Sequence, residues 1–332
     1  MNKTHVMIFS ILFFAVVFGY ALLGRISPSS GILEGDTQKN LPEITIVMQE
    51  GQGKYTILWS LENNLTKLPE GVNIIVADVD KANNLLISGN ADMGFMSTAS
   101  YAAISDKKNT TLKIISTGTT QSEAGIFTYR GSNITLNNLG SVKTILTPPA
   151  SSTNFILFKG VLKDKFNITF NPDKVIFISK PVSVVPKLLE NKDADIGVIS
   201  NIVYFDALNN PKLELLYNYA DGFNDLYGHN AISTVVVADE RVLSDPRIKD
   251  IMSVLKESWV IGSNNIDKVD KWVFDVYGLN YSAEFRYNKD KVQFEPLNEK
   301  TVGAIRQIWL YGKDAGVVEN VPDIDSAIAK ID

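Results

Sequence analysis

Residues 85–97 read Leu-Leu-Ile-Ser-Gly-Asn-Ala-Asp-Met-Gly-Phe-Met-Ser, and residues 188–200 read Leu-Leu-Glu-Asn-Lys-Asp-Ala-Asp-Ile-Gly-Val-Ile-Ser. Each copy has the pattern of a helix end, a short polar turn, a buried strand and a serine at the carboxyl end of that strand. Open α/β sheets bind ligands in the crevice beyond such strand ends. The duplication therefore predicts two similar lobes, with Ser97 and Ser200 facing one shared ligand site.

The composition narrows the classes of function. A chain of 332 residues with 45% apolar content can bury a large core and is long enough for about two domains. A net charge of -5 argues against nucleic acid as a partner. The absence of cysteine excludes disulfides, thiol catalysis and iron–sulfur clusters, and two histidines, His5 and His229, exclude a histidine-rich metal site. We expect no catalytic residue, no metal and no cofactor.

The amino-terminal region indicates the compartment. Residues 6–23 form an uncharged, largely apolar run that would span about 27 Å as a helix, close to the ~30 Å core of a bilayer. Gly19 and Ala21 also place small residues at a plausible signal-cleavage spacing. A membrane anchor, a cleaved signal segment and, third, a buried core helix all stay open. Either of the first two predicts an extracytoplasmic protein, which is anchored at the membrane or is secreted if residues 1–21 are cleaved.

The rest of the chain alternates strand and helix patterns. This alternation predicts an α/β fold in which each lobe is a mostly parallel sheet flanked by helices. We expect helices at 54–68 and 153–166, a strand at 112–116, and a helix that begins at Asp245-Pro246. The predicted organisation is an anchor or signal at 1–25, a flexible tether at 26–42, the first part of lobe 1 at 43–128, lobe 2 at 129–231, and the remainder of lobe 1 at 232–332.

Five motifs, taken together, resemble one family. They are Gly-x-Ala-Asp-x-Gly at 89–94, Pro-x-Ser-Ser-Thr at 149–153, the second Ala-Asp-x-Gly at 194–197, Leu-Asn-Glu-Lys-Thr at 297–301 and Gly-Lys-Asp-Ala-Gly-Val-Val at 312–318. The ordered set is similar to the solute-binding proteins of ABC transporters, in the group that binds nitrate, alkanesulfonates, taurine or thiamine precursors. The resemblance covers about residues 43–330. It implies the type II periplasmic-binding-protein fold, with two lobes joined by two crossover strands, and an ABC permease with its ATPase as partners.

If the lobes face each other, the loops at the strand ends line the site between them. These loops carry mainly neutral hydroxyls and amides, and several begin helices whose first N–H groups and dipole favour negative charge. They can therefore hold a small polar or anionic solute without an arginine. The candidate residues are Gln49, Gln52, Ser97, Thr98, Thr120, Gln121, Ser151, Ser152, Thr153, Asn154, Ser200 and Asn201.

The segment 217–230 could add an adaptable wall with hydrogen-bonding tips. From it we take Tyr227, His229 and Asn230 as further ligand-binding candidates, although a lone histidine is also consistent with a structural role.

Several of the highlighted residues also have structural interpretations. Ser97, Ser151 and Ser200 are suited to capping helices without contacting a ligand. Asp92 and Asp195 are expected to bond to backbone rather than to form a catalytic pair. Gly94 and Gly197 are expected to permit close packing of helix on strand.

The leading hypothesis is a monomeric receptor that captures a solute by bending near residues 129 and 231 and presents it to an ABC importer. Six Asn-x-Ser/Thr sequences suit a surface glycoprotein; they begin at Asn2, Asn64, Asn109, Asn133, Asn167 and Asn280. An enzyme on the same fold, similar to thiamine-pyrimidine synthases, is an alternative, but the resemblance implies cysteines and histidines that this chain does not supply. An extracytoplasmic sensing module is a third possibility.

Overall fold

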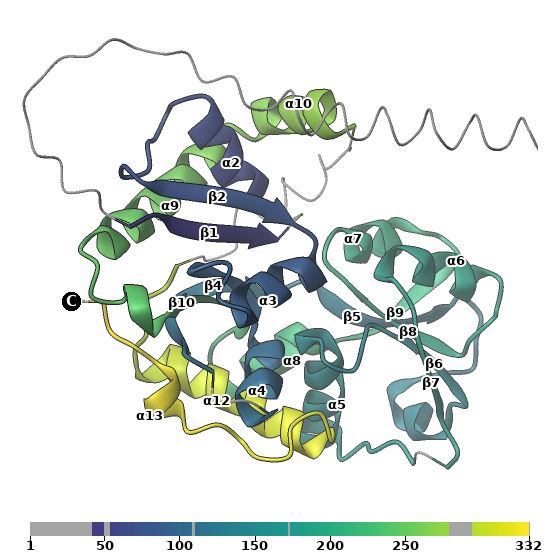
Figure 1. The fold of residues 1–332 in the computed structure, drawn as a ribbon. Coiled ribbons are helices and arrows are strands. Elements are labelled where there is room, and N and C mark those ends of the chain that lie inside the picture. The colour runs from purple at the N-terminus through teal and green to yellow at the C-terminus, as the bar shows by residue number, and fades with distance from the viewer. Residues whose placement is uncertain (1–41, 50–53, 108–109, 172, 279–293, 332) are drawn as a thin grey trace, which may run out of the picture. The chain divides into compact units, whose positions relative to one another are not determined.

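The computed structural model describes residues 42–49, 54–107, 110–171, 173–278 and 294–331 (Figure 1). From Pro42 onward the chain forms one compact unit, and its strands make two five-stranded sheets. The expected anchor, signal and tether segments, as well as Gln52, lie outside the described residues.

The first sheet has the strand order β2-β1-β3-β10-β4. Strand β1 is parallel to β2 and β3, whereas β10 is antiparallel to both β3 and β4. Four strands therefore run in one direction and β10 runs in the other. The strands are β1 (Ile44–Gln49), β2 (Val72–Ala77), β3 (Met93–Ser97), β4 (Leu112–Gln121) and β10 (Ala231–Asp239).

The second sheet repeats this arrangement in the order β7-β6-β8-β5-β9, with β5 as the one reversed strand. In each sheet the reversed strand is the one that arrives from the other sheet: β5 follows β4 of the first sheet, and β10 follows the last strand of the second. The strands are β5 (Ala124–Tyr129), β6 (Thr144–Thr147), β7 (Ile176–Ser179), β8 (Ile196–Ser200) and β9 (Leu213–Asn218).

Helices separate most of the strands, as the alternating pattern predicted. Those before β4 or after β10 are α2 (Lys54–Glu62), α3 (Val79–Ile87), α4 (Thr98–Lys107), the 3-10 helix η3 (Glu240–Val242), α9 (Arg247–Asn264), α10 (Ile266–Tyr277), α12 (Glu299–Asp314) and α13 (Ile324–Ala327). Those between β5 and β10 are α5 (Thr153–Phe166), α6 (Val185–Glu190), α7 (Ile202–Asn209), α8 (Tyr219–Tyr227), and the 3-10 helices η1 (Leu136–Ser141) and η2 (Val182–Val184). This two-lobed α/β architecture confirms the predicted fold class.

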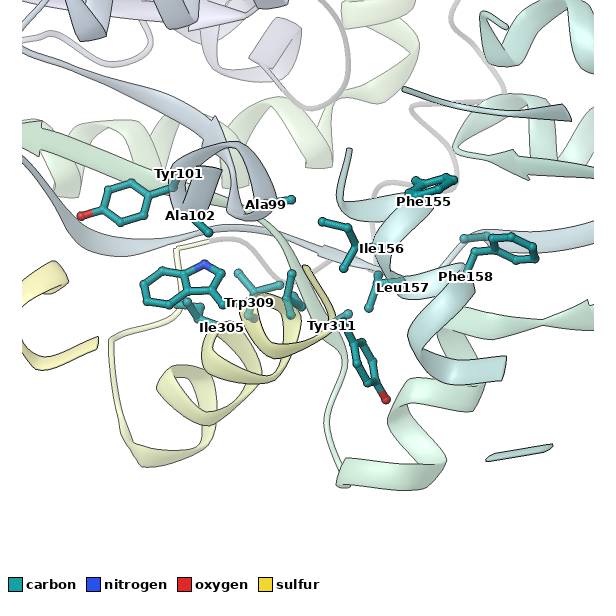
Figure 2. Close-up of a cluster of buried hydrophobic side chains, with 14 of the residues drawn as sticks. Ala99, Tyr101, Ala102, Phe155, Ile156, Leu157, Phe158, Ile305, Trp309 and Tyr311 are labelled. Atoms are coloured by element: carbon teal, nitrogen blue, oxygen red, sulfur yellow. The ribbon is translucent and has the colours of Figure 1, made fainter. Parts of the chain in front are cut away.

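One hydrophobic core extends through both lobes. Figure 2 shows its centre, where side chains of α4, α5 and α12 meet. The rings of Tyr101 and Trp309 stack with centroids 5.7 Å apart, and both side chains are almost completely buried. Burying a large apolar side chain contributes about 1.5–3 kcal/mol, so this contact holds α12 firmly on α4. Two smaller cores lie under α2 and α9 in the first lobe and under α6 and α7 in the second.

Three elements differ from expectation. The helix expected at 54–68 ends at Glu62, and the chain then turns through Asn64, whose φ is 55°. The strand expected at 112–116 continues to Gln121, so Thr120 and Gln121 are in a strand and not in a loop. The expected wall at 217–230 is largely helix α8, because Asn218 caps its start and Gly228 ends it in a left-handed conformation with φ 72°.

Candidate functional site

The two aspartates of the repeated unit have matching structural roles. A carboxylate oxygen of Asp92 accepts a hydrogen bond from the backbone N of Thr45 at 2.8 Å, where β1 begins. The Asp195 carboxylate accepts from the N of Lys143 at 2.6 Å and of Thr144 at 2.9 Å, where β6 begins. Each aspartate thus ties its own strand to the start of the neighbouring parallel strand. The expected structural role is confirmed.

The two glycines of the repeat allow a helix to lie directly on its strand. A Cβ at Gly94 would lie 2.6 Å from the backbone O of Val47 and 3.2 Å from the Leu86 side chain of α3. At Gly197 it would lie 2.4 Å from the side chain of Val185 in α6. The expected close packing is confirmed in both lobes, and it fixes the position of the serine that ends each strand.

Ser97 and Ser200 are the last residues of β3 and β8, and the first two residues of α5 connect them. The Ser97 and Thr153 hydroxyl oxygens are 3.0 Å apart, and Asn154 donates to the Ser200 hydroxyl at 3.2 Å. Thr153 donates its own proton to the backbone O of Ser233 at 3.1 Å, so Ser97 must be the donor to Thr153.

Tyr219 completes this group, which we call the strand-end cluster: Ser97, Thr153, Asn154, Ser200 and Tyr219. Its hydroxyl donates to the side-chain oxygen of Asn154 at 3.2 Å, which leaves the amide NH₂ of Asn154 to face Ser200. Burial raises the pKa of Tyr219 well above its usual value, so the hydroxyl stays protonated and remains a donor. Tyr219 was not predicted as a site residue, because its sequence neighbourhood indicated only a polar wall.

The capping expectations are partly wrong. Ser152, not Ser151, caps α5 by accepting from the N of Phe155 at 3.2 Å, and Ser151 is exposed. Asn201, not Ser200, occupies the cap position of α7 and makes no side-chain capping bond. Ser97 lies 3.5 Å from the N of Ser100, at the limit of a hydrogen bond.

Other predicted site residues are engaged in internal hydrogen bonds. Thr98 donates to the O of Ile232 at 2.6 Å. Gln121 donates to the O of Glu123 at 3.0 Å, and Gln49 donates to the side chain of Asn83 at 3.4 Å. The bonds made by Thr98 and Gln121 stabilise the two regions where the chain passes from one sheet to the other.

Glu123 is a site feature that the sequence analysis did not identify. It lies between β4 and β5, is only 7% exposed, and accepts from the N of Asn201 through its backbone O at 2.9 Å. This backbone hydrogen bond ties the crossover between the two sheets to the residue that precedes α7. Local sequence could not show this, because the burial arises only when the two sheets are placed side by side.

The remaining candidates lie elsewhere. Thr120, His229 and Asn230 line a cavity of about 270 Å³ that also borders the first turn of α12 and includes Glu295 and Lys300. We call it the hinge cavity, because residues 228–230 line it where the chain returns to the first sheet and Thr120 lies shortly before the chain leaves that sheet. The hydroxyl of Tyr227 is bonded to Asp164 and Tyr311, each at 2.8 Å. The structure therefore separates the predicted residues into the strand-end cluster with its neighbours, a second group at the hinge cavity, and Tyr227, which bonds to α5 and α12.

Within the described residues, no three His, Asp or Glu side chains gather in a way that could hold a metal ion. No helix among those same residues is both long and apolar enough to span a bilayer.

The sequence matches a protein family described as ABC transporter, phosphonate, periplasmic substrate-binding protein, over residues 60–252. Because the match covers more than half of the 332 residues, the chain belongs to this family. It is therefore an extracytoplasmic solute-binding protein of an ABC importer, in a class of transport proteins rather than enzymes. Its partners are a small solute and the permease with its ATPase.

Solved structures share the fold at low sequence identity. The periplasmic aliphatic sulphonate binding protein SsuA from Escherichia coli has a TM-score of 0.69 and 13% identity, covering 88% of this chain and 94% of that one. The alkanesulfonate-binding protein SsuA from Xanthomonas axonopodis pv. citri, bound to MOPS, has a TM-score of 0.65 and 14% identity over 87% and 99%. The ligand-binding component of an ABC-type import system from Staphylococcus aureus, with zinc bound, has a TM-score of 0.62 and 14% identity over 87% and 97%. No curated protein sequence matches the chain.

Proposed function

We propose that the strand-end cluster holds a small polar or anionic solute between the two lobes. The observation that supports this proposal is the pair of hydrogen bonds made by the first two residues of α5, between Thr153 and Ser97 and between Asn154 and Ser200. It joins the carboxyl ends of equivalent strands in two lobes, which is where open α/β sheets bind ligands.

The chemistry of the cluster favours a solute that accepts hydrogen bonds. Its side chains are neutral donors and acceptors, and Thr153 and Asn154 begin α5, a 14-residue helix whose dipole favours negative charge. Each bond to an ionised ligand contributes about 1.5–3 kcal/mol, so a few such bonds can hold a sulfonate, a phosphonate or a similar anion. Ser151, Ser152 and Asn201, beside the cluster, are proposed as further contacts.

The solute would enter as the lobes separate at the strand-end side. In the present conformation Ser97 bonds directly to Thr153 of the other lobe. An oxygen of the solute would replace this bond, and closure around the solute would be the state that the permease recognises. The bending points would be residues 122–123 and 228–230, where the chain passes between sheets; the first differs from the expected position near residue 129, because β5 already belongs to the second sheet. Thr120, His229 and Asn230 would then influence closure rather than contact the solute.

A calorimetric titration tests the proposal. Methylphosphonate, 2-aminoethylphosphonate, ethanesulfonate, taurine and nitrate would be titrated into the protein and into Ser97→Ala and Ser200→Ala variants. We expect at least one compound to bind, and each variant to bind it roughly tenfold or more weakly, because one hydrogen bond to the solute is lost.

Ser326→Ala is the matched control, since Ser326 is exposed in α13 and its hydroxyl bonds only to the O of Asp323. Equal affinity of the control and the two cluster variants would show that the solute binds elsewhere.

We also propose that residues 6–23 anchor the protein in the membrane and that the protein is a monomer. Glycans would occupy the sequences at Asn64, Asn133 and Asn167, whose side chains are exposed. Retention in the membrane pellet after carbonate extraction would support the anchor, and release into the supernatant would contradict it.

A further inference from the structure

A second cavity lies in the first lobe, away from the strand-end cluster. It measures about 500 Å³, within the usual size range of small-molecule sites. Its walls come from β4, the start of α9, the segment 294–297 and the carboxyl-terminal residues 329–331. We call it the lysine groove.

The floor of the lysine groove is apolar and held in place. Its apolar residues are Ile115, Met252, Phe294, Pro296, Leu297, Ala329 and Ile331. The Phe294 ring packs edge-on against Phe95 with centroids 5.8 Å apart, although its own backbone has the uncommon positive φ of 58°. The backbone N of Ala329 donates to the O of Ile114 at 2.9 Å, which fixes the carboxyl-terminal wall against β4.

Three lysines surround this floor: Lys249, Lys256 and Lys330. All three side chains are exposed, and none forms an ion pair with another residue in the described part of the chain. Lys249 and Lys256 are two helical turns apart on α9, so both project to the same side of that helix. A concentration of positive charge over an apolar floor is notable in a chain whose net charge is -5.

We propose that the lysine groove binds a single-chain anionic amphiphile, with the apolar chain on the floor and the anionic head among the three lysines. An apolar chain buries its surface against the floor, and the head meets cations that have no carboxylate partner in the described structure. A purely polar anion would leave the floor exposed, and a neutral chain would leave the lysines unmatched. This proposal is independent of the solute in the strand-end cluster.

Sodium dodecanoate, below its micellar concentration, is the probe. It would be titrated calorimetrically into residues 42–332, a compact unit that contains every contact described above. We expect saturable binding of one dodecanoate. Acetate and the neutral dodecyl maltoside should bind roughly tenfold or more weakly, because each lacks one of the two contacts.

The triple variant Lys249→Gln/Lys256→Gln/Lys330→Gln should lower the affinity for dodecanoate roughly tenfold. The matched control is Lys67→Gln/Lys174→Gln/Lys268→Gln, which removes the same charge from three exposed lysines outside the groove. Met252→Gln tests the floor with a side chain of similar length, and it should also weaken binding.

Three results would overturn the proposal: no binding of dodecanoate, equal binding of dodecyl maltoside, or equal loss of affinity in the control and in the groove variant. The Ser97→Ala and Ser200→Ala variants distinguish the two sites. They should bind dodecanoate normally, and a loss in these variants would mean that the amphiphile occupies the strand-end cluster instead.

Discussion

Gly160 in α5 lies directly beneath the ring of Tyr311 in α12. A Cβ at this position would lie 2.2–2.5 Å from three carbons of that ring. Gly160→Ala should therefore push the two helices apart and destabilise the protein by about 1–3 kcal/mol, the usual effect of overpacking a core. Urea unfolding of the variant and the parent protein measures this loss.

Gly303→Ala in α12 is the control. Gly303 is exposed within the helix, and a Cβ there would have nothing within 4 Å. Alanine should stabilise the helix by about 0.5–1 kcal/mol, because glycine loses more backbone freedom on folding. If both variants lose stability equally, the contact between Gly160 and Tyr311 is not the cause.

Single residues could be predicted from the sequence where they recur at the same place in a duplicated pattern, even when the partner is as distant as Thr45 is from Asp92. Asp92, Asp195, Gly94 and Gly197 belong to a repeated local pattern, and their roles were predicted correctly. Tyr219 acts through Asn154, which lies 65 positions away, so no local pattern could reveal it.

Arg247, in the first turn of α9, fastens the start of that helix to the first sheet. It is 6% exposed, and its guanidinium donates to the O of Pro42 at 2.7 Å, to the O of Glu70 at 3.0 Å and to Asp245 at 2.6 and 2.9 Å. Arg247→Gln removes most of these bonds. We expect a loss of about 1.5–3 kcal/mol at pH 7, measured by urea unfolding.

The ion pair of Arg247 and Asp245 should also make the free energy of unfolding depend on pH. The hydrogen bond from Arg247 holds the pKa of Asp245 below its ordinary value, so the pair stabilises the fold above the unfolded pKa of about 3.9. That stabilisation is lost as the pH falls through the lower pKa of the folded state. Arg247→Gln should therefore lose less stability than the parent between pH 5 and pH 2. Arg306→Gln, at an exposed position in α12, should follow the parent curve.

Helices were predicted well where an apolar stripe extends from cap to cap. The bounds of α5 match the expectation of 153–166, and α9 begins directly after Asp245-Pro246. Helix α8 was not predicted, because six of its nine residues are Tyr, Asp, Asn or Gly. Its residues Ala220 and Phe223 are buried beside α5, and this packing, which the local sequence does not show, accounts for the helix.

At the scale of the whole molecule, α12 packs on helices of both lobes. It contacts α4 through Trp309 and α5 through Tyr311, whose hydroxyl bonds to Asp164 at 2.8 Å. Burial raises the pKa of Tyr311 far above its usual value and that of Tyr227 to about 12, so both hydroxyls stay protonated beside Asp164 at physiological pH. We therefore expect the lobes to rotate about this contact, with most of the movement at the strand ends.

Two pairs of spin labels test this rotation. The chain has no cysteine, so spin labels attach only to cysteines that are introduced. The two double variants are Asp80→Cys/Lys180→Cys and Asn167→Cys/Leu310→Cys, all at exposed positions. The first pair lies just beyond the carboxyl ends of strands β2 and β7, and so it reports the distance between the strand ends of the two lobes. The second pair reports the distance between α5 and α12. The solute identified by titration should shorten the first distance and leave the second unchanged. An equal change in both would place the pivot elsewhere.

The exchange of strands between the sheets also governs the order in which the lobes can form on the ribosome. The second sheet contains only strands from Ala124 to Asn218, whereas the first needs β10, which ends at Asp239, to bridge β3 and β4. Chains are synthesised from the amino terminus. All strands of lobe 2 have therefore been made before the last strand of lobe 1, β10, is complete. The first sheet cannot be completed until translation has passed lobe 2 and β10 has been made. Until then, the edges of β3 and β4 that pair with β10 have no partner strand.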